Sequence, residues 1–239
     1  MPSPLMLVLA FGVVILGASV QSLIGFGLAV VAAPLLYFID PSLVPTPLLL
    51  LGFAISAINW FHNRNYADFK SMGGALVMRI PGALIGLWLL LHFDAKGLQI
   101  LIAIAVLMGV ATTLTKRALR FNQRNLLIAG FISGLFATVA GIGGPPMAVL
   151  MRAQQANAIR GNLSAFFSVS SLISIFILGI GGQVHVHHLI STLILLPAVF
   201  IGFFLSKNII NKFDRKQITC TTQIVCCLSA VTLIYQALS

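Results

Sequence analysis

The feature that most constrains this chain is a series of apolar runs, each about as long as a membrane is thick. A helix needs roughly 20 apolar residues to cross a hydrocarbon core of about 30 Å. Runs of this kind recur down the whole sequence, at 5–39, 43–61, 72–91, 98–115, 125–151, 161–181, 189–206 and 217–238. With 59% apolar and 8% charged residues, the chain has no room for a soluble domain. We therefore expect an all-α membrane protein surrounded by a lipid bilayer.

The formal net charge of +10 comes from 14 Lys and Arg residues dispersed in short loops between the apolar runs. A nucleic-acid-binding protein gathers such residues, with aromatic side chains, on one polar face, so we expect no nucleic acid partner. The positive-inside rule instead places three loops in the cytoplasm: 64–70, 116–124 and 207–216. The loop at 93–96 has no net charge and the loop at 181–188 has no Lys or Arg, so both are expected outside.

The two halves of the sequence share a repeated pattern. The motif GFG at 25–27 matches GIG at 141–143. Pro81 matches Pro197 at the same offset, so the register holds over a large part of each half. We therefore divide the chain into two repeats, which span residues 1–118 and 119–239.

Each half contains one odd segment, which carries the glycine motif, followed by three ordinary apolar runs. The odd segment is too long for one helix in the first copy and too short for two crossings in the second, so we interpret it as a broken re-entrant hairpin. Three single crossings per half then orient the copies oppositely, with Asp94 outside and its counterpart Asp214 inside. Such inverted repeats are typical of secondary transporters, which hold substrate near the midplane where broken helices meet.

The two glycine-rich breaks indicate an internal binding site, because unpaired backbone groups in a bilayer are tolerated only inside protein or beside a water-filled cavity. Half-helices that begin just after Gly27 and Gly144 would direct free N–H groups and positive dipole ends toward the centre, which favours an anion. In the alternative interpretation these residues serve only packing or kinking. The candidate substrate-binding residues at the breaks are Gln21, Ser22, Gly25, Phe26, Gly27, Thr138, Gly141, Gly143, Gly144, Pro145 and Pro146.

Arg79 is a further candidate for the binding site. It lies several positions inside the run 72–91, where a cation is costly and usually has a partner, and no acid near it in the sequence is an obvious one. An anionic substrate would supply that charge, and the guanidinium offers a forked donor to oxyanion oxygens. In the alternative interpretation the side chain snorkels to the cytoplasmic interface.

The paired motifs, GFG at 25–27 and GIGGPP at 141–146, in a chain of this hydropathy resemble those of the TauE/SafE family of sulfite exporters. The resemblance covers essentially the full length. It implies a protein that moves sulfite, thiosulfate, sulfoacetate or related sulfur-containing or organic anions, generally across the bacterial inner membrane. The motifs identify the family and not the substrate. No cysteine lies near either break, such as a thiosulfate-uptake relative would use.

Other residues that carry chemistry give weaker indications. His185, His187 and His188 form one short run without Cys or acidic ligands, so an outside loop is a better interpretation than a metal site. The segment 130–134 reads Gly-x-x-Ser-Gly and not the Gly-x-Ser-Gly of a membrane serine protease. We therefore expect no enzyme activity, no metal and no cofactor.

Polar residues near the breaks have two possible roles. Arg152 and Arg160 flank the loop after the second hairpin, where they attract anions to the inner mouth or, as we favour, follow the positive-inside rule. Other polar side chains either line the pathway or, for the most part, serve helix packing. They are Asn59, Asn162, Ser164, Ser168, Ser170 and Ser171.

The sequence thus predicts a secondary transporter or exporter of a small anion, sulfite or a sulfonate, held between two hairpins while the halves rock around it. The alternatives are an anion channel and a transporter of a small organic carboxylate. The chain contains no Glu, and its four Asp residues lie at or near loops. Proton-coupled carriers commonly use an intramembrane carboxylate, so we favour efflux driven by the membrane potential, or anion exchange. The sequence does not decide whether the protein forms a homodimer.

Overall fold

The structure, a computed structural model, describes residues 4–114, 119–209 and 215–238. Within these ranges the chain forms only helices. The first half contains α1 (Pro4–Ile24), α2 (Leu28–Ile39), η1 (Pro41–Leu43), α3 (Thr46–Asn63), η2 (Arg64–Tyr66), α4 (Phe69–His92) and α5 (Ala95–Leu114). The second half contains α6 (Gln123–Ala140), α7 (Gly144–Met151), α8 (Ala156–Ile180), α9 (Val186–Ile209) and α10 (Arg215–Leu238).

The helices follow the apolar runs, so the prediction of an all-α chain with membrane-length helices is confirmed. Six helical segments in the described ranges are long and apolar enough to cross a membrane: Pro4–Ile24, Ser71–His92, Ala95–Thr112, Gln123–Ala140, Ala156–Ile180 and Val186–Ser206. Helix α3 has the length but is not among them. Its second half carries Asn59, His62 and Asn63, which lower its hydropathy.

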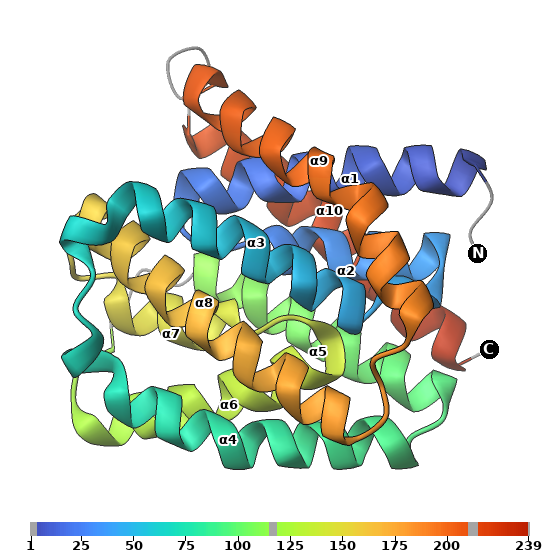
Figure 1. Cartoon of the computed structure of the whole chain (residues 1–239), viewed down its shortest axis with the longest axis horizontal. Helices are drawn as coiled ribbons and strands as arrows, with labels where there is room; N and C mark the ends of the chain where they lie inside the picture. The colour runs from blue at the N-terminus through green and yellow to red at the C-terminus, as the bar shows by residue number, and fades with distance from the viewer. Residues whose placement is uncertain (1–3, 115–118, 210–214, 239) are drawn as a thin grey trace.

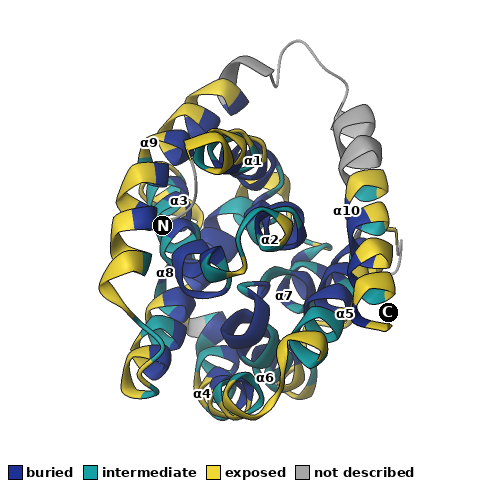
Figure 2. Ribbon diagram, turned by 90° about the vertical axis from the view of Figure 1, so that its right-hand side faces the viewer, coloured by how far each residue is buried: buried dark blue, intermediate teal, exposed yellow. Residues whose placement is uncertain are grey.

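The long helices lie side by side in a bundle, with the two chain termini at the same end (Figure 1). Helices from different halves form the main pairs: α4 packs along α6, α1 along α9, α3 along α8 and α5 along α10. Buried residues face the middle of the bundle and exposed ones face outward, as on α4 and α9 (Figure 2). Many exposed side chains are large and apolar, including Leu193, Phe204 and Leu228, as expected where lipid is the solvent.

The two ends of the bundle differ in charge. At one end the α3–α4 connection meets the start of α8, where the N–H of Asp68 donates to Asn162 Oδ1 at 2.7 Å. At the opposite end Thr46 Oγ1 donates to the carbonyl of Gln183 at 3.0 Å. We call the first of these the basic end. The segments 64–66, 119–124 and 152–160 lie there (Figure 1), and they carry Arg64, Arg120, Arg124, Arg152 and Arg160.

Glycines bring the backbones of α4 and α6 into close contact. A Cβ atom added at Gly82 would collide with the carbonyl of Phe131, and one added at Gly134 would collide with the carbonyl of Arg79. Both glycines belong to Gly-x-x-x-Gly patterns, with Gly86 and Gly130 as the other members. Small residues at this spacing let membrane helices approach closely, so α4 is held directly against α6 along the length that carries Arg79.

Because α4 and α6 lie so close together, two glycines of α4 should differ in how well they tolerate substitution by alanine. Gly82→Ala should lower the thermal unfolding midpoint in detergent, because overpacking against fixed backbone costs roughly 1–3 kcal/mol. Gly73→Ala is the matched control, since no atom lies within 4 Å of the Cβ it would add. Equal midpoints for the two variants would contradict this account of the α4–α6 contact.

Candidate functional site

A partly open cavity lies between the two helix breaks. The predicted residues that line it are Gln21, Phe26, Gly27, Arg79, Gly141, Gly143 and Gly144. The remaining lining residues are Leu28, Ala29, Val30, Leu49, Gly52, Ser56, Ala137, Ile142, Phe167, Ser170 and Ser171. The predicted residues outside the lining are Ser22, Gly25, Thr138, Pro145 and Pro146.

The first break separates α1 from α2 and depends on glycine. Gly25 and Gly27 have φ angles of 98° and 130°, which residues with a Cβ rarely adopt. Gln21 then reaches across the break: its Oε1 accepts from the N–H of Leu28 at 3.2 Å, and its Nε2 donates to Ser56 Oγ at 2.9 Å. This side chain therefore caps α2 and ties the break to α3.

The start of α2 still presents backbone donors to the cavity. The first N–H groups of a helix have no partner within the helix, and Gln21 satisfies only that of Leu28. Ala29 and Val30 belong to this first turn and line the cavity. The first break therefore offers the N–H groups and positive dipole end that the sequence predicts for an anion site.

The second break differs from the first in its chemistry. Gly141 ends α6 in the left-handed region, with φ 74°, and its N–H donates to the carbonyl of Ala137 at 2.8 Å. Helix α7 begins at Gly144, with Pro145 and Pro146 in its first turn. Proline fixes the helical φ angle but has no N–H group. This break thus has fewer free backbone donors than the first one.

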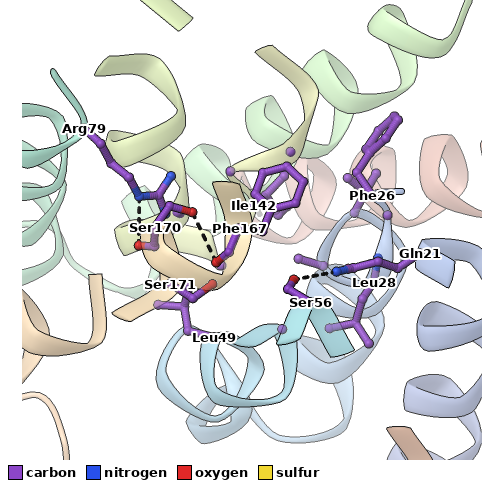
Figure 3. Close-up of a pocket in the computed structure, with 18 residues that line it drawn as sticks. Gln21, Phe26, Leu28, Leu49, Ser56, Arg79, Ile142, Phe167, Ser170 and Ser171 are labelled. Atoms are coloured by element: carbon purple, nitrogen blue, oxygen red, sulfur yellow. Dashed lines mark hydrogen bonds between the residues drawn. The ribbon is translucent and has the colours of Figure 1, made fainter. Parts of the chain in front are cut away.

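Arg79 supplies hydrogen-bond donors beside the second break. Its side chain is 1% exposed, so it does not snorkel to the membrane interface. The Nε group donates to the carbonyl of Ser170 at 2.9 Å, a contact drawn in Figure 3. The two terminal nitrogens donate to serine hydroxyls, Nη1 to Ser133 at 2.7 Å and Nη2 to Ser174 at 3.1 Å. The guanidinium, which α4 carries, is therefore fixed by hydrogen bonds to α6 and α8.

The same hydrogen bonds connect Arg79 to the backbone of the second break. Ser133 Oγ, which accepts from Nη1, donates to the carbonyl of Gly143 at 2.6 Å. A Cβ atom added at Gly143 would lie 3.1 Å from Nη1. The guanidinium also lies over the ring of Phe166, with 5.8 Å between Cζ and the ring centroid. The second break and the guanidinium of Arg79 are thus connected through the hydroxyl of Ser133.

No carboxylate among the described residues pairs with the buried positive charge of Arg79. All hydrogen-bond acceptors of Arg79 among the described residues are neutral oxygens. The described carboxylates, Asp40, Asp68 and Asp94, lie in the connections between helices. Burial of an unpaired ion costs several kcal/mol. Guanidinium has five N–H groups, and three of them donate to the described residues.

The cavity has polar groups on two facing sides and apolar side chains between them. Figure 3 shows Arg79, Ser170 and Ser171 on one side and Gln21 and Ser56 on the other. The side chains of Ile142 and Phe167 lie between these two groups (Figure 3). Such a site suits a small ligand with an anionic group and room for a small apolar part.

Ser133 and Ser174, whose hydroxyls hold Arg79, were not predicted from the sequence as site residues. Their signal in the sequence is weak, because serine is common in membrane helices and packs there in many roles. His185, His187 and His188, by contrast, lie near one another at the end opposite the basic end, with ring centroids of His187 and His188 4.0 Å apart. No group of three or more His, Cys, Asp and Glu in the described ranges is arranged to hold a metal ion.

The chain is similar to the proteins of a known family. The family model described as Sulfite exporter TauE/SafE matches residues 9–233. No curated protein and no solved structure matches the chain. The match spans both breaks, the cavity and all ten α-helices in whole or in part, and it implies membrane transport. The chain therefore belongs to the TauE/SafE sulfite exporter family.

Proposed function

We propose that this protein is a secondary transporter that exports a small anion, sulfite or a sulfonate, through the cavity between the two breaks. The observation that carries the proposal is Arg79, a fully buried cation whose described partners are all neutral. A buried charge in a membrane protein marks a functional site by default, with a partner of opposite sign. A bound anion provides that partner, and the family provides the chemical class.

The anion binds between two kinds of donor. On one side are the two free N–H groups of Arg79, and on the other are the first-turn N–H groups of Ala29 and Val30 with the dipole of α2. Oxyanions have several acceptor oxygens in different directions, so donors on facing sides match them. A small organic carboxylate is the second candidate, because Ile142 and Phe167 give the cavity apolar contacts.

We further propose that the chain is an inverted repeat of residues 1–118 and 119–239, with α1–α2 and α6–α7 as re-entrant hairpins. Helix order supports this, since each half has a long helix, a break, a short helix and three long helices. Packing supports it too: α4 lies along α6, and their repeat counterparts α9 and α1 also pair. Helices α2 and α7, with 12 and 8 residues, are too short to cross a bilayer.

The charge distribution supports an orientation in the membrane. By the positive-inside rule, the basic end faces the cytoplasm and both chain termini lie outside. Family membership supports a location in the bacterial inner membrane. The described carboxylates lie in the connections, which favours efflux driven by the membrane potential, or anion exchange, over proton coupling.

A variant of Arg79 tests the proposed function. Sulfite should raise the thermal unfolding midpoint of the purified protein in a saturable way, because a ligand that binds only the folded state stabilises it. Arg79→Met should weaken the apparent affinity by about tenfold or more, since a hydrogen bond to a charged group contributes roughly 1.5–3 kcal/mol. Arg79→Lys, which keeps the charge but loses the fork, should give an intermediate value.

The control for this variant is Arg124→Gln, which removes an exposed charge at the basic end. It should keep the wild-type affinity for sulfite. Sulfite efflux from proteoliposomes should saturate with concentration in a transporter, whereas non-saturating flux would indicate the channel alternative. Wild-type affinity in Arg79→Met would overturn the proposed site.

The link between Arg79 and the second break gives a separate prediction. Gly143→Ala should weaken sulfite binding while the protein still inserts and folds, because the new methyl group crowds Nη1 of Arg79 at 3.1 Å and Ser133 Oγ at 3.0 Å. Gly179→Ala in α8 is the control, since its Cβ would meet no atom within 4 Å. If both variants bind sulfite equally in the thermal-shift assay, the break does not position Arg79.

A further inference from the structure

Helix α3 carries a line of polar side chains that leads from the central cavity toward the basic end. Ser56, Asn59 and Asn63 recur at a spacing of three to four residues, so they share one face of the helix. Ser56 lines the cavity, and Asn63 is the last residue of the helix. These residues also lower the hydropathy of α3, which is not among the six membrane-length apolar segments of the described ranges.

These side chains are joined to one another and to the end of α1. Asn59 Nδ2 donates to Ser22 Oγ at 3.3 Å, and Asn63 Nδ2 donates to the carbonyl of Asn59 at 2.9 Å. Ser22 follows Gln21, whose own amide contacts Ser56. Ser22, Ser56 and Asn59 are all buried. The first break and α3 therefore share a continuous polar seam, which we call the inner seam and define as Ser22, Ser56, Asn59 and Asn63.

On the other side of the cavity the described residues make a shorter set of buried polar contacts: Arg79 Nη2 donates to Ser174 Oγ at 3.1 Å, and Thr138 Oγ1 donates to Ser174 Oγ at 3.4 Å. Toward the opposite end the described part of the chain places an apolar cluster built on Leu49, Ala137 and Leu178. Leu49 and Ala137 are themselves lining residues of the cavity. Polar groups buried in a membrane protein carry an energetic cost unless they are paired or line a path for polar solutes. A line of polar side chains therefore leads from the cavity to the basic end, whereas an apolar cluster adjoins the cavity on its other side.

Arg160 lies where the inner seam reaches the basic end. A Cβ atom added at Gly25 would be 3.4 Å from Cα and 3.6 Å from Cγ of Arg160, so this residue packs on the first break. The next residue, Gly161, is in the same close contact with the end of α3, where an added Cβ would be 3.0 Å from the carbonyl of Asn63. The start of α8 therefore touches both elements that form the seam.

The guanidinium of Arg160 has an unsatisfied donor. Its Nη2 group donates to Asn157 Oδ1 at 2.8 Å. Its Nε atom is buried and has no hydrogen-bond partner among the residues that the structure describes. The side chain as a whole is partly exposed, so water or a ligand can reach it. A buried donor on a cation is costly to leave unpaired, more so than on a neutral group. Arg152, on the other side of the same connection, differs because its Nη2 donates to the carbonyl of Thr112.

We propose that Arg160 is a second binding position for a small oxyanion, and that the inner seam connects it to the cavity at Arg79. An anion that leaves Arg79 toward the basic end then moves along the polar inner seam to a second cation, Arg160. Conduction between sites needs binding strong enough to admit an ion and weak enough to release it, which two successive sites achieve better than one deep site. The proposal rests on the proposed function only in taking the cavity as the start of the route.

Thiol labelling tests the route without a transport measurement. The three native cysteines, Cys220, Cys226 and Cys227, are changed to serine, and Ser22→Cys is introduced into the seam. Vesicles that present the basic end to the reagent are selected with Asn65→Cys, an exposed position at that end. Ser22→Cys should react about tenfold faster with anionic 2-sulfonatoethyl methanethiosulfonate than with the cationic 2-trimethylammonioethyl reagent, because a basic cleft concentrates anions.

Arg160→Gln should abolish this preference, whereas Arg124→Gln, which removes an equal but exposed charge, should keep it. Ser229→Cys is the matched control for burial, since Ser229 is 7% exposed and Ser22 is 8% exposed, and it should react slowly with both reagents. No reaction at Ser22→Cys, or a preference unchanged by Arg160→Gln, would overturn the proposal. A preference that depends on Arg160 together with unchanged sulfite binding in Arg79→Met would keep the route and refute the central site.

Discussion

The guanidinium of Arg79, held away from water and from carboxylates, is the interaction on which the centre of this protein depends. Its burial requires α4 to lie directly against α6, which the glycines at 82 and 134 allow. Its orientation depends on hydroxyls on two helices. One of these, Ser133 Oγ, also donates a hydrogen bond to the carbonyl of Gly143. Helix packing, the cation and the second break are therefore one connected arrangement, and a change in any of them moves the others.

The two breaks contribute to the site in different ways although their motifs match. The first break leaves backbone N–H groups at the start of α2, and Gln21 satisfies only that of Leu28. The second break has prolines at the corresponding place, which remove donors, and a cationic side chain from α4 replaces them. An oxyanion between the breaks would thus contact the N–H groups at the start of α2 on one side and the guanidinium of Arg79 on the other.

Much of the fold was predictable because lipid imposes a simple rule on sequence, that crossing segments must be apolar and of fixed length. The glycine motifs located the breaks for a similar reason, since only glycine adopts the φ angles at positions 25 and 27 without strain. Side-chain partners across helices were not predictable. Ser133 and Ser174 hold Arg79 only because of how α6 and α8 rotate against α4, and packing, not local pattern, sets that rotation.

The charges do not follow the proposed repeat. At the offset that matches Pro81 with Pro197, Arg79 corresponds to Leu195, so the second half has no equivalent cation there. One cation balances one negative charge, which favours a monoanion such as a sulfonate or hydrogensulfite over a dianion in a medium of low dielectric constant. The polar face of α3 adds a second asymmetry, because it extends from the cavity toward one end only. Under the proposed function, two related halves would therefore enclose one central site and still give the anion a preferred path, since the chemistry on its two sides differs.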